Sequence, residues 1–326
     1  VHGDTVVEVP PESRIEWERI LTEGTRSERL GGVFTSVQEV DHGRELEKRS
    51  GDAPTPLVRK LYLELPAPSL DDSLSDLERL LRGLGRADCG TQPHVPLSVV
   101  RRLGRVLRKS NWCVTATLAG TDGRSELILL EPGDTSKSLY GVVVDVGTTT
   151  VVASLVDLAT GRILDTKAAQ NRQGRYGQDV ITRIIYSEKD QGLSELHKAV
   201  TDTINGLIAS MVAEQKTSLN AVLLVNCAGN TTMAHLLLGI DPYYIRRDPF
   251  VPTASRIPLS RASETGIRVN PRGMLVCMPN VASYVGGDIT AGVLASGLHL
   301  ADAPTMLIDL GTNGEIALGN REWLVC

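Results

Sequence analysis

The sequence predicts an α/β protein, and three observations lead to that prediction. From Tyr140 onward, short apolar runs alternate with helix-like segments, the order typical of α/β domains. A strand, a Gly-Thr turn and a second strand occur twice, in YGVVVDVGTTTVV at 140–152 and in MLIDLGTNGEIAL at 306–318. The shorter region before Tyr140 contains enough strands and helices for a small α+β domain. We therefore expect a small α+β domain followed by an α/β domain with a duplicated hairpin.

Composition and charge narrow the classes of function. The 326 residues are 41% apolar and 22% charged, which suffices for a buried core. The net charge is -5 and no basic stripe is concentrated, so no nucleic-acid partner is expected. The longest apolar runs, AVLLVN and GVVVDV, fall short of the roughly 20 residues of a membrane span. We expect neither a nucleic acid nor a membrane as partner.

The cysteines and the chain ends add three expectations. The five cysteines show no C-x-x-C pair, which predicts neither a metal site nor a disulfide framework and favours the reducing cytoplasm. The chain begins with valine and ends in the strand-like REWLVC, so we interpret both ends as cut. The predicted domains are a linker at 1–54, a middle α+β domain at 55–138 and an α/β domain at 139–326.

The smaller domain is predicted element by element. LVRKLYLEL at 57–65 is a strand, and a helix from about Ser69 places leucines 74, 77, 80 and 81 on one face. A second helix spans Leu97–Lys109, and the strands WCVTATLAG and RSELILLEP follow it. Periodicity of 3.6 residues in the helices and short apolar runs in the strands support each assignment.

The larger domain begins with the hairpin at 140–152, and the Thr-Gly of DLATGRIL turns the chain into a third strand. A long helix at Leu193–Glu214 has one apolar stripe and leads into the buried strand AVLLVN. The second hairpin then repeats the first, with GNREWLV following it.

The two Gly-Thr turns are candidate phosphate loops. Glycine lets the backbone turn tightly, so main-chain N–H groups and Thr or Asn side chains can converge on a phosphate. Asp145 and Asp309 precede the turns, where a carboxylate can hold magnesium through water or accept a proton. The plain alternative is two ordinary hairpins with polar turns. The candidate loop residues are Gly147, Thr148, Thr149 and Thr150 in the first turn, and Gly311, Thr312, Asn313 and Gly314 in the second.

Two further segments are candidate parts of the same site. In AGNTTMAH, Gly229, Asn230 and Thr231 precede a helix, as an anion-facing helix start or as a plain N-cap. In VGGDIT, Gly286 and Gly287 could admit a phosphate while Asp288 works with magnesium. The alternative is that Asp288 lies at or near the cap of a helix.

Other polar residues have simpler interpretations. In NRQGRYGQDVITRI, Asp179 predicts a capped helix, and the simplest interpretation of Arg183 is a pair with a carboxylate. The alternative is that this stretch contacts a substrate or partner. His235 lies among leucines and is expected to be packed or hydrogen-bonded rather than catalytic. Cys227 and Cys277 are expected to act as small hydrophobic residues.

The paired turns resemble the phosphate loops of the ATPase superfamily of actin, heat-shock chaperones and sugar kinases. The strings NRQGRYGQDVITRI, VNCAGNTTMAHLLLGIDP and NVASYVGGDITAGVLASG are similar to those of reductive activators of corrinoid proteins. VHGDTVVEVPPESR resembles the stretch that follows the ferredoxin domain in that family.

The resemblance implies an actin-like ATPase domain, its second half incomplete, which uses ATP with magnesium to return a Co(II) corrinoid protein to Co(I). Asp145, Asp288 and Asp309 would be the catalytic residues, and Asp145 and Asp309 would hold magnesium through water. Electrons would come through a ferredoxin-like domain with a [2Fe-2S] cluster, for which this chain has no C-x4-C-x2-C ligands. The partners implied are a corrinoid protein and a second copy in a homodimer. Two alternatives stay open: a phosphotransferase of the superfamily, and a non-catalytic docking module.

Overall fold

The structure is a computed structural model that describes residues 56–87, 92–121, 124–311 and 314–326. All described residues belong to one compact unit of the chain, within His42–Cys326. The linker predicted at 1–54 lies outside the described residues. No helix of the described part has the length and apolar content needed to cross a membrane.

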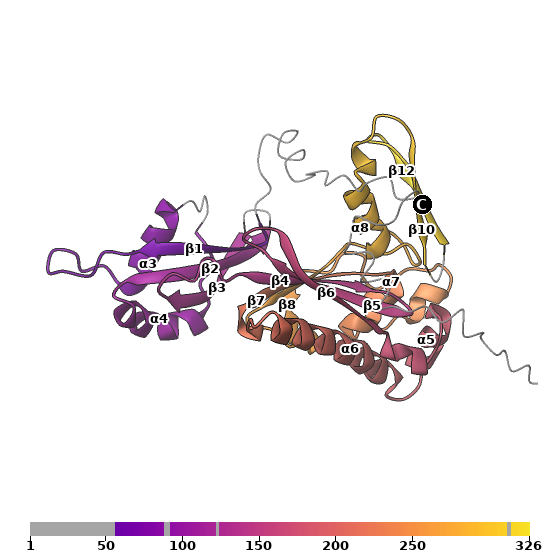
Figure 1. Ribbon diagram of the computed structural model, residues 1–326, viewed down its shortest axis with the longest axis horizontal. Helices are drawn as coiled ribbons and strands as arrows, with labels where there is room; N and C mark the ends of the chain where they lie inside the picture. Colours follow the sequence, from indigo (N-terminus) through magenta and orange to yellow (C-terminus); the bar gives the residue numbers. More distant parts are fainter. Residues whose placement is uncertain (1–55, 88–91, 122–123, 312–313) are drawn as a thin grey trace, which may run out of the picture. The chain divides into compact units, whose positions relative to one another are not determined.

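The first part of the described chain is a three-stranded antiparallel sheet with two helices (Figure 1). Leucines from both helices and from the strands, among them Leu80, Leu103 and Leu127, form one buried cluster. The elements are β1 (Val58–Glu64), α3 (Asp76–Arg86), α4 (Leu97–Lys109), β2 (Cys113–Thr121) and β3 (Arg124–Pro132). The predicted strands and the helix at Leu97–Lys109 are therefore confirmed.

The first helix starts later than predicted. Ser75 is the N-cap of α3, and its side chain and that of Glu78 form a capping box. A capping box satisfies two backbone donors at once and therefore fixes the helix start. The predicted start near Ser69 is wrong, because Ser69 forms a short bridge with Asp72 instead.

The centre of the larger part is a six-stranded sheet in the order β6-β5-β4-β7-β9-β8 (Figure 1). β4 lies antiparallel to β5 and parallel to β7, and β7 lies parallel to β9. The strands are β4 (Tyr140–Val146), β5 (Thr150–Asp157), β6 (Arg162–Gln170), β7 (Val222–Ala228), β8 (Ser260–Arg261) and β9 (Met274–Cys277). The predicted first hairpin and its third strand are confirmed.

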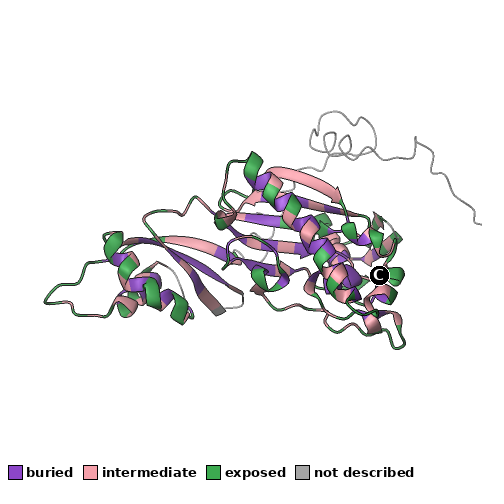
Figure 2. Ribbon diagram, turned by 90° about the horizontal axis from the view of Figure 1, so that it is seen from below, coloured by how far each residue is buried: buried purple, intermediate pink, exposed green. Residues whose placement is uncertain are grey.

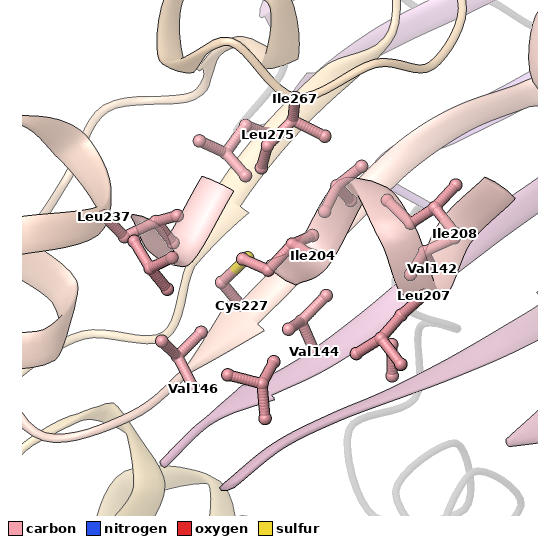
Figure 3. Close-up of a cluster of buried hydrophobic side chains, with 14 of the residues drawn as sticks. Val142, Val144, Val146, Ile204, Leu207, Ile208, Cys227, Leu237, Ile267 and Leu275 are labelled. Atoms are coloured by element: carbon pink, nitrogen blue, oxygen red, sulfur yellow. The ribbon is translucent and has the colours of Figure 1, made fainter. Parts of the chain in front are cut away.

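Helices connect and cover these strands. The longest, α6, packs Ile204 and Ile208 against the valines of β4, and Figure 3 shows these side chains in one cluster. In Figure 2, α6 alternates between buried and exposed residues along its length. The α-helices are α5 (Val180–Ser187), α6 (Gly192–Glu214), α7 (Thr231–Leu238) and α8 (Gly287–Ser296). Short 3₁₀ helices are η2 (Arg172–Arg175), η3 (Leu219–Ala221), η4 (Tyr243–Arg246), η5 (Ala262–Thr265) and η6 (Leu298–Leu300).

The second predicted hairpin is also present. β10 (Thr305–Leu310) pairs antiparallel with β11 (Gly314–Gly319), which pairs with β12 (Leu324–Val325). Asp309 lies opposite Glu315 near the turn, as Asp145 lies opposite Val152 in the first hairpin. An antiparallel strand pair that contains the aspartate therefore occurs twice in space as well as in sequence, and the predicted α/β class is confirmed.

Candidate functional site

The candidate site lies where the parallel strands β4, β7 and β9 end. Residues opposite one another in these strands include Asp145 with Ala228 and Cys227 with Cys277. The carboxyl ends of the three strands therefore lie at one edge of the sheet, the place where ligands bind in open α/β sheets. The segments that follow them contain the first turn, Asn230 and Asp288.

Three carboxylates from separate parts of the sequence influence one another electrostatically near this edge. Partial withdrawal of water raises the pKa of Asp145 to about 6, and the negative charges of Asp288 and Asp309 add to this rise. Burial raises the pKa of Asp288 as well, and Asp309 contributes there too. Asp145 is nonetheless an exposed residue, so its carboxylate remains open to a ligand from solvent. Mutual repulsion of this kind favours a proton or a cation among the three groups.

Hydrogen bonds from Asn171 to carbonyl oxygens hold the first turn, Gly147–Thr149, in place. The Asn171 side-chain amide donates to Gly147 O over 2.9 Å, and the Asn171 backbone N–H donates to Thr149 O over 2.8 Å. A Cβ on Gly147 would come within 2.4 Å of Thr150 O. The predicted role of Gly147 in a tight turn is therefore confirmed.

Asn230 links the first turn to the start of α7. Its Oδ1 accepts from the backbone N–H of Met233 over 2.9 Å, which makes it the N-cap of the helix. Its Nδ2 donates to Thr148 Oγ1 over 3.2 Å. The N-cap interpretation is therefore confirmed, and an anion-facing role for this helix start stays a prediction. Thr231 instead is fully buried and donates its hydroxyl to Ala282 O over 2.5 Å.

Arg183 has a role that neither sequence interpretation anticipated. Its side chain is only 1% exposed and donates to Thr148 O over 2.6 Å and to Gly177 O over 2.8 Å. The ion pairs among the described residues do not include it. The expected pairing with a carboxylate is therefore wrong, because carbonyl oxygens surround this guanidinium.

Gly286 and Gly287 bring two backbone segments into contact. A Cβ on Gly286 would lie 2.3 Å from Asn230 Cα, and one on Gly287 would lie 2.9 Å from Met278 O. The backbone N–H of Gly287 donates to Gly229 O over 2.8 Å. Protein atoms thus occupy the space that these glycines leave, and approach of a phosphate to them stays a prediction that this packing does not support.

Asp288 lies in the first turn of α8 but is not its N-cap. The N-cap is Gly286, which has no side chain to cap the helix. Asp288 Oδ1 accepts from the N–H of Ile289 over 2.9 Å. A carboxylate in the first turn is favoured by the positive end of the helix. The expected helix start is confirmed, and the carboxylate lies two residues inside it.

The second turn is described only in part. Gly311 is exposed and Gly314 begins β11, whereas Thr312 and Asn313 lie outside the described residues. Thr150 begins β5 and pairs with Gln170. The phosphate-binding roles of these five residues stay predictions.

His235 and the two strand cysteines have structural environments. His235 is fully buried, its Nδ1 lies 2.7 Å from Thr231 O, and burial lowers its pKa. Burial raises the pKa of the Cys227 thiol well above its usual value and that of Cys277 to about 12. The packed interpretation of all three residues agrees with these surroundings.

The donors present suit magnesium and a phosphate better than a directly ligated metal. The described residues contain no group of three or more His, Cys, Asp or Glu side chains positioned to hold a metal ion. Magnesium keeps several waters and uses few carboxylates, so the clustered aspartates fit it through water. The described cysteines are all free thiols, and they provide no cluster ligand set.

The comparisons with known proteins concern most of the described chain. The model of the RACo linker region matches residues 49–137, and that of the RACo middle region matches residues 140–301. The corrinoid activation enzyme RamQ of Eubacterium limosum is 33% identical over 199 residues, which are 61% of this chain and 33% of that protein.

A solved structure, the reductive activator for a corrinoid, iron-sulfur protein, is 43% identical with a TM-score of 0.80. The match covers 86% of this chain and 46% of that one. This chain therefore spans about a third of the curated relative and under half of the solved one. Consecutive family models and a close structural match agree, and the chain belongs to the RACo family, the reductive activators of corrinoid proteins.

Proposed function

We propose that this chain is the nucleotide-binding part of an ATP-dependent reductive activator, which returns a corrinoid protein from Co(II) to Co(I). Reduction of Co(II) in such proteins is uphill for ordinary donors, so nucleotide hydrolysis would drive a change that permits electron transfer. Family membership supports the reaction class. The electrons would arrive through a ferredoxin-like [2Fe-2S] domain, whose ligands are not among the described residues.

The observation that carries the proposal is the electrostatic influence that Asp145, Asp288 and Asp309 exert on one another, with Asp145 at the end of β4 just before the first turn. The charges of Asp288 and Asp309 raise the pKa of Asp145, and the charge of Asp309 raises the pKa of Asp288. A cation bound near the three carboxylates would therefore be stabilised. The magnesium ion of Mg-ATP would supply that positive charge, and the phosphates would bind at the turn. When bound, the magnesium would neutralise charge on the phosphates during their hydrolysis.

The residues of this chain would divide the work. Asp145 and Asp309 would hold magnesium through water, and Asp288 would complete the acidic cluster. With a pKa of about 6, Asp145 is suited to accept a proton from water near neutral pH. The turn Gly147–Thr150 would hold phosphate oxygens, with Asn230 fixing the Thr148 hydroxyl.

The partners follow from the same proposal. A corrinoid protein would dock on the actin-like domain, a ferredoxin-like domain would deliver electrons, and two copies would form a homodimer in the cytoplasm. The relatives named above are activators of corrinoid proteins by name, and this supports the choice of partner.

The test is product analysis with the full-length protein. Mg-ATP hydrolysis should release only ADP and phosphate, and Asp145→Asn should lose it. A stoichiometric phosphorylated small acid or sugar would instead support the phosphotransferase. Absence of nucleotide binding would support a docking module and contradict the proposal.

A further inference from the structure

The buried guanidinium of Arg183 lies directly behind the first turn. Four contacts hold it: Nε to Gly177 O (2.8 Å), Nη1 to Gln173 Oε1 (3.1 Å) and Met233 Sδ (3.2 Å), and Nη2 to Thr148 O (2.6 Å). Every one of these acceptors is formally neutral. The chain thus places a full positive charge out of water with no carboxylate bonded to it among the described residues, although burial of a charge is costly unless it is paired.

The charge persists at neutral pH. Burial lowers the pKa of Arg183 to about 10, and the more distant charge of Asp179 acts in the opposite direction. Asp179 itself is committed to capping α5, where its Oδ1 accepts from the N–H of Thr182 over 2.9 Å. The cation therefore remains uncompensated by any short ion pair within the described protein.

Hydrogen bonds on the carbonyl side also set the orientation of the turn. In a planar trans peptide the C=O and the following N–H point in opposite directions. Asn171 binds the oxygen of the Gly147–Thr148 peptide, and Arg183 binds that of the Thr148–Thr149 peptide. The N–H sides of both peptides are consequently directed away from Arg183 and Asn171, as in backbone concavities that bind anions.

A network of buried amides makes this arrangement rigid. Gln173 is fully buried, donates to Leu196 O over 3.0 Å, and accepts from both Arg183 and Asn171. The two residues that hold the turn are thus bonded through one side chain to α6, the long helix of the core. A turn held in this way needs little reorganisation when an anion binds, which favours affinity.

We propose that Arg183 is a positioning residue for the phosphates of the nucleotide: it holds the Thr148 carbonyl and places an uncompensated positive charge behind the Gly147–Thr149 turn. This inference rests on the proposed function, because it assigns the anion to the nucleotide. Arg183 touches no phosphate itself and acts through the turn. The bound phosphates are the missing counter-charge.

The experiment compares Arg183→Met and Arg183→Lys with Arg79→Met in the full-length protein. Arg79 is equally buried, at 1% exposure, but lies on α3 and bonds to Asp72, so it reports the loss of any buried arginine. Binding of Mg-ATP and of adenosine is measured by calorimetry, each variant well below its own unfolding midpoint. Adenosine carries no phosphate and therefore reports the rest of the nucleotide site.

We expect Arg183→Met to weaken Mg-ATP binding at least about tenfold, because a charge-assisted contact and its field are lost. Arg183→Lys keeps the positive charge but loses the planar guanidinium with its several N–H donors. It should recover about a third to a half of the lost Mg-ATP affinity on a logarithmic scale. Arg79→Met should stay within about twofold of wild type because its hydrogen bonds go to Pro66, Asp72 and Leu74 and to no residue of the turn. Adenosine binding should be unchanged in all variants.

Two different results overturn two different claims. If wild type binds Mg-ATP and both Arg183 variants bind it within about twofold of Arg79→Met, Arg183 is only a packing residue and the inference is wrong. Equal weakening of adenosine and Mg-ATP by Arg183→Met would also contradict it, since the effect would not concern phosphates. If wild type binds no Mg-ATP, the proposed function itself fails. Should Arg183→Met not fold, the Lys variant decides against the same control.

Discussion

Asn230 donates its side-chain amide to the hydroxyl of Thr148 over 3.2 Å while its oxygen caps α7. One side chain thus joins the turn after β4 to the helix after β7, two segments 82 residues apart in the sequence. Because β4 and β7 are parallel neighbours, their following segments meet at the same edge. This bond therefore couples the stability of a helix start to the shape of the candidate phosphate loop.

Asn230→Ala should lose both functions of this side chain. Removal of an N-cap costs about 1 kcal/mol of unfolding free energy, and the Thr148 hydroxyl loses its fixed partner. Denaturant unfolding should show the loss of stability, and Mg-ATP affinity should fall with it. Asn230→Asp is the matched control, since it keeps the cap acceptor but replaces the amide donor: stability should be retained while Mg-ATP affinity still falls. Equal Mg-ATP affinity in both variants and wild type would contradict the coupling.

Asp145→Asn should raise stability at neutral pH and leave it unchanged in acid. The folded protein raises the pKa of Asp145 from 3.8 to about 6, so the folded state binds more protons than the unfolded state between these values. Wild-type stability from this group is fully present below the lower value and is lost as pH rises through the higher one. The side-chain amide of the Asp145→Asn variant does not ionise, so the variant does not lose this stability as pH rises.

The measurement is the unfolding midpoint of both proteins from acid to neutral pH. Asp134 offers an opposite control, because hydrogen bonds from Ser136 lower its pKa, so Asp134→Asn should not gain stability as pH rises. A pH-independent difference between wild type and Asp145→Asn would show that Asp145 is not perturbed as described. Magnesium binding should strengthen across the same pH range, as Asp145 ionises.

Gly286→Ala should destabilise the protein, because its Cβ would lie 2.3 Å from Asn230 Cα. Overpacking of this kind costs roughly 1–3 kcal/mol. Gly206, in the middle of α6, has no atom within 4 Å of its virtual Cβ, so Gly206→Ala should stabilise by about 0.5–1 kcal/mol. Chemical denaturation measures both. Equal tolerance at the two positions would contradict the close backbone contact at Gly286.

Thiol labelling should separate the cysteines by environment. Cys227 and Cys277 are buried with raised pKa values, and only the thiolate reacts with iodoacetamide. Mass spectrometry of the native protein at pH 8 should therefore find the exposed Cys326 modified well before these two. Rapid native labelling of Cys227 or Cys277 would contradict the packing at the end of β7 and β9.

Much of the fold was predictable because local pattern and tertiary structure agree in it. The hairpin at 140–152 and the helix at Leu97–Lys109 have clear periodicity and turn signals. The start of α3 was missed because the apolar periodicity does not fix a helix start, whereas the capping box between Ser75 and Glu78 does. Apolar periodicity alone therefore places a helix start only approximately.

The site was predictable in its members but only partly in their roles. Asp145 and Asp309 each lie near the end of a predicted strand. The influence of Asp288 on Asp145 depends on the parallel order of β4, β7 and β9, and that of Asp309 depends on a separate sheet, β10-β11-β12. Arg183 sits in a polar segment, and nothing in its neighbours reveals that two of its acceptors, Thr148 O and Met233 Sδ, come from distant parts of the sequence. The pair Asn171 and Gln173 offered one usable signal, two amides just after a strand.

The most direct measurement of the central claim follows the Co(I) absorbance of a corrinoid protein mixed with the full-length activator, a reductant and Mg-ATP. Wild type should form Co(I) only when ATP is hydrolysed, and Asp145→Asn, correctly folded, should form none. Formation of Co(I) at the same rate without ATP, or undiminished in Asp145→Asn, would contradict the account.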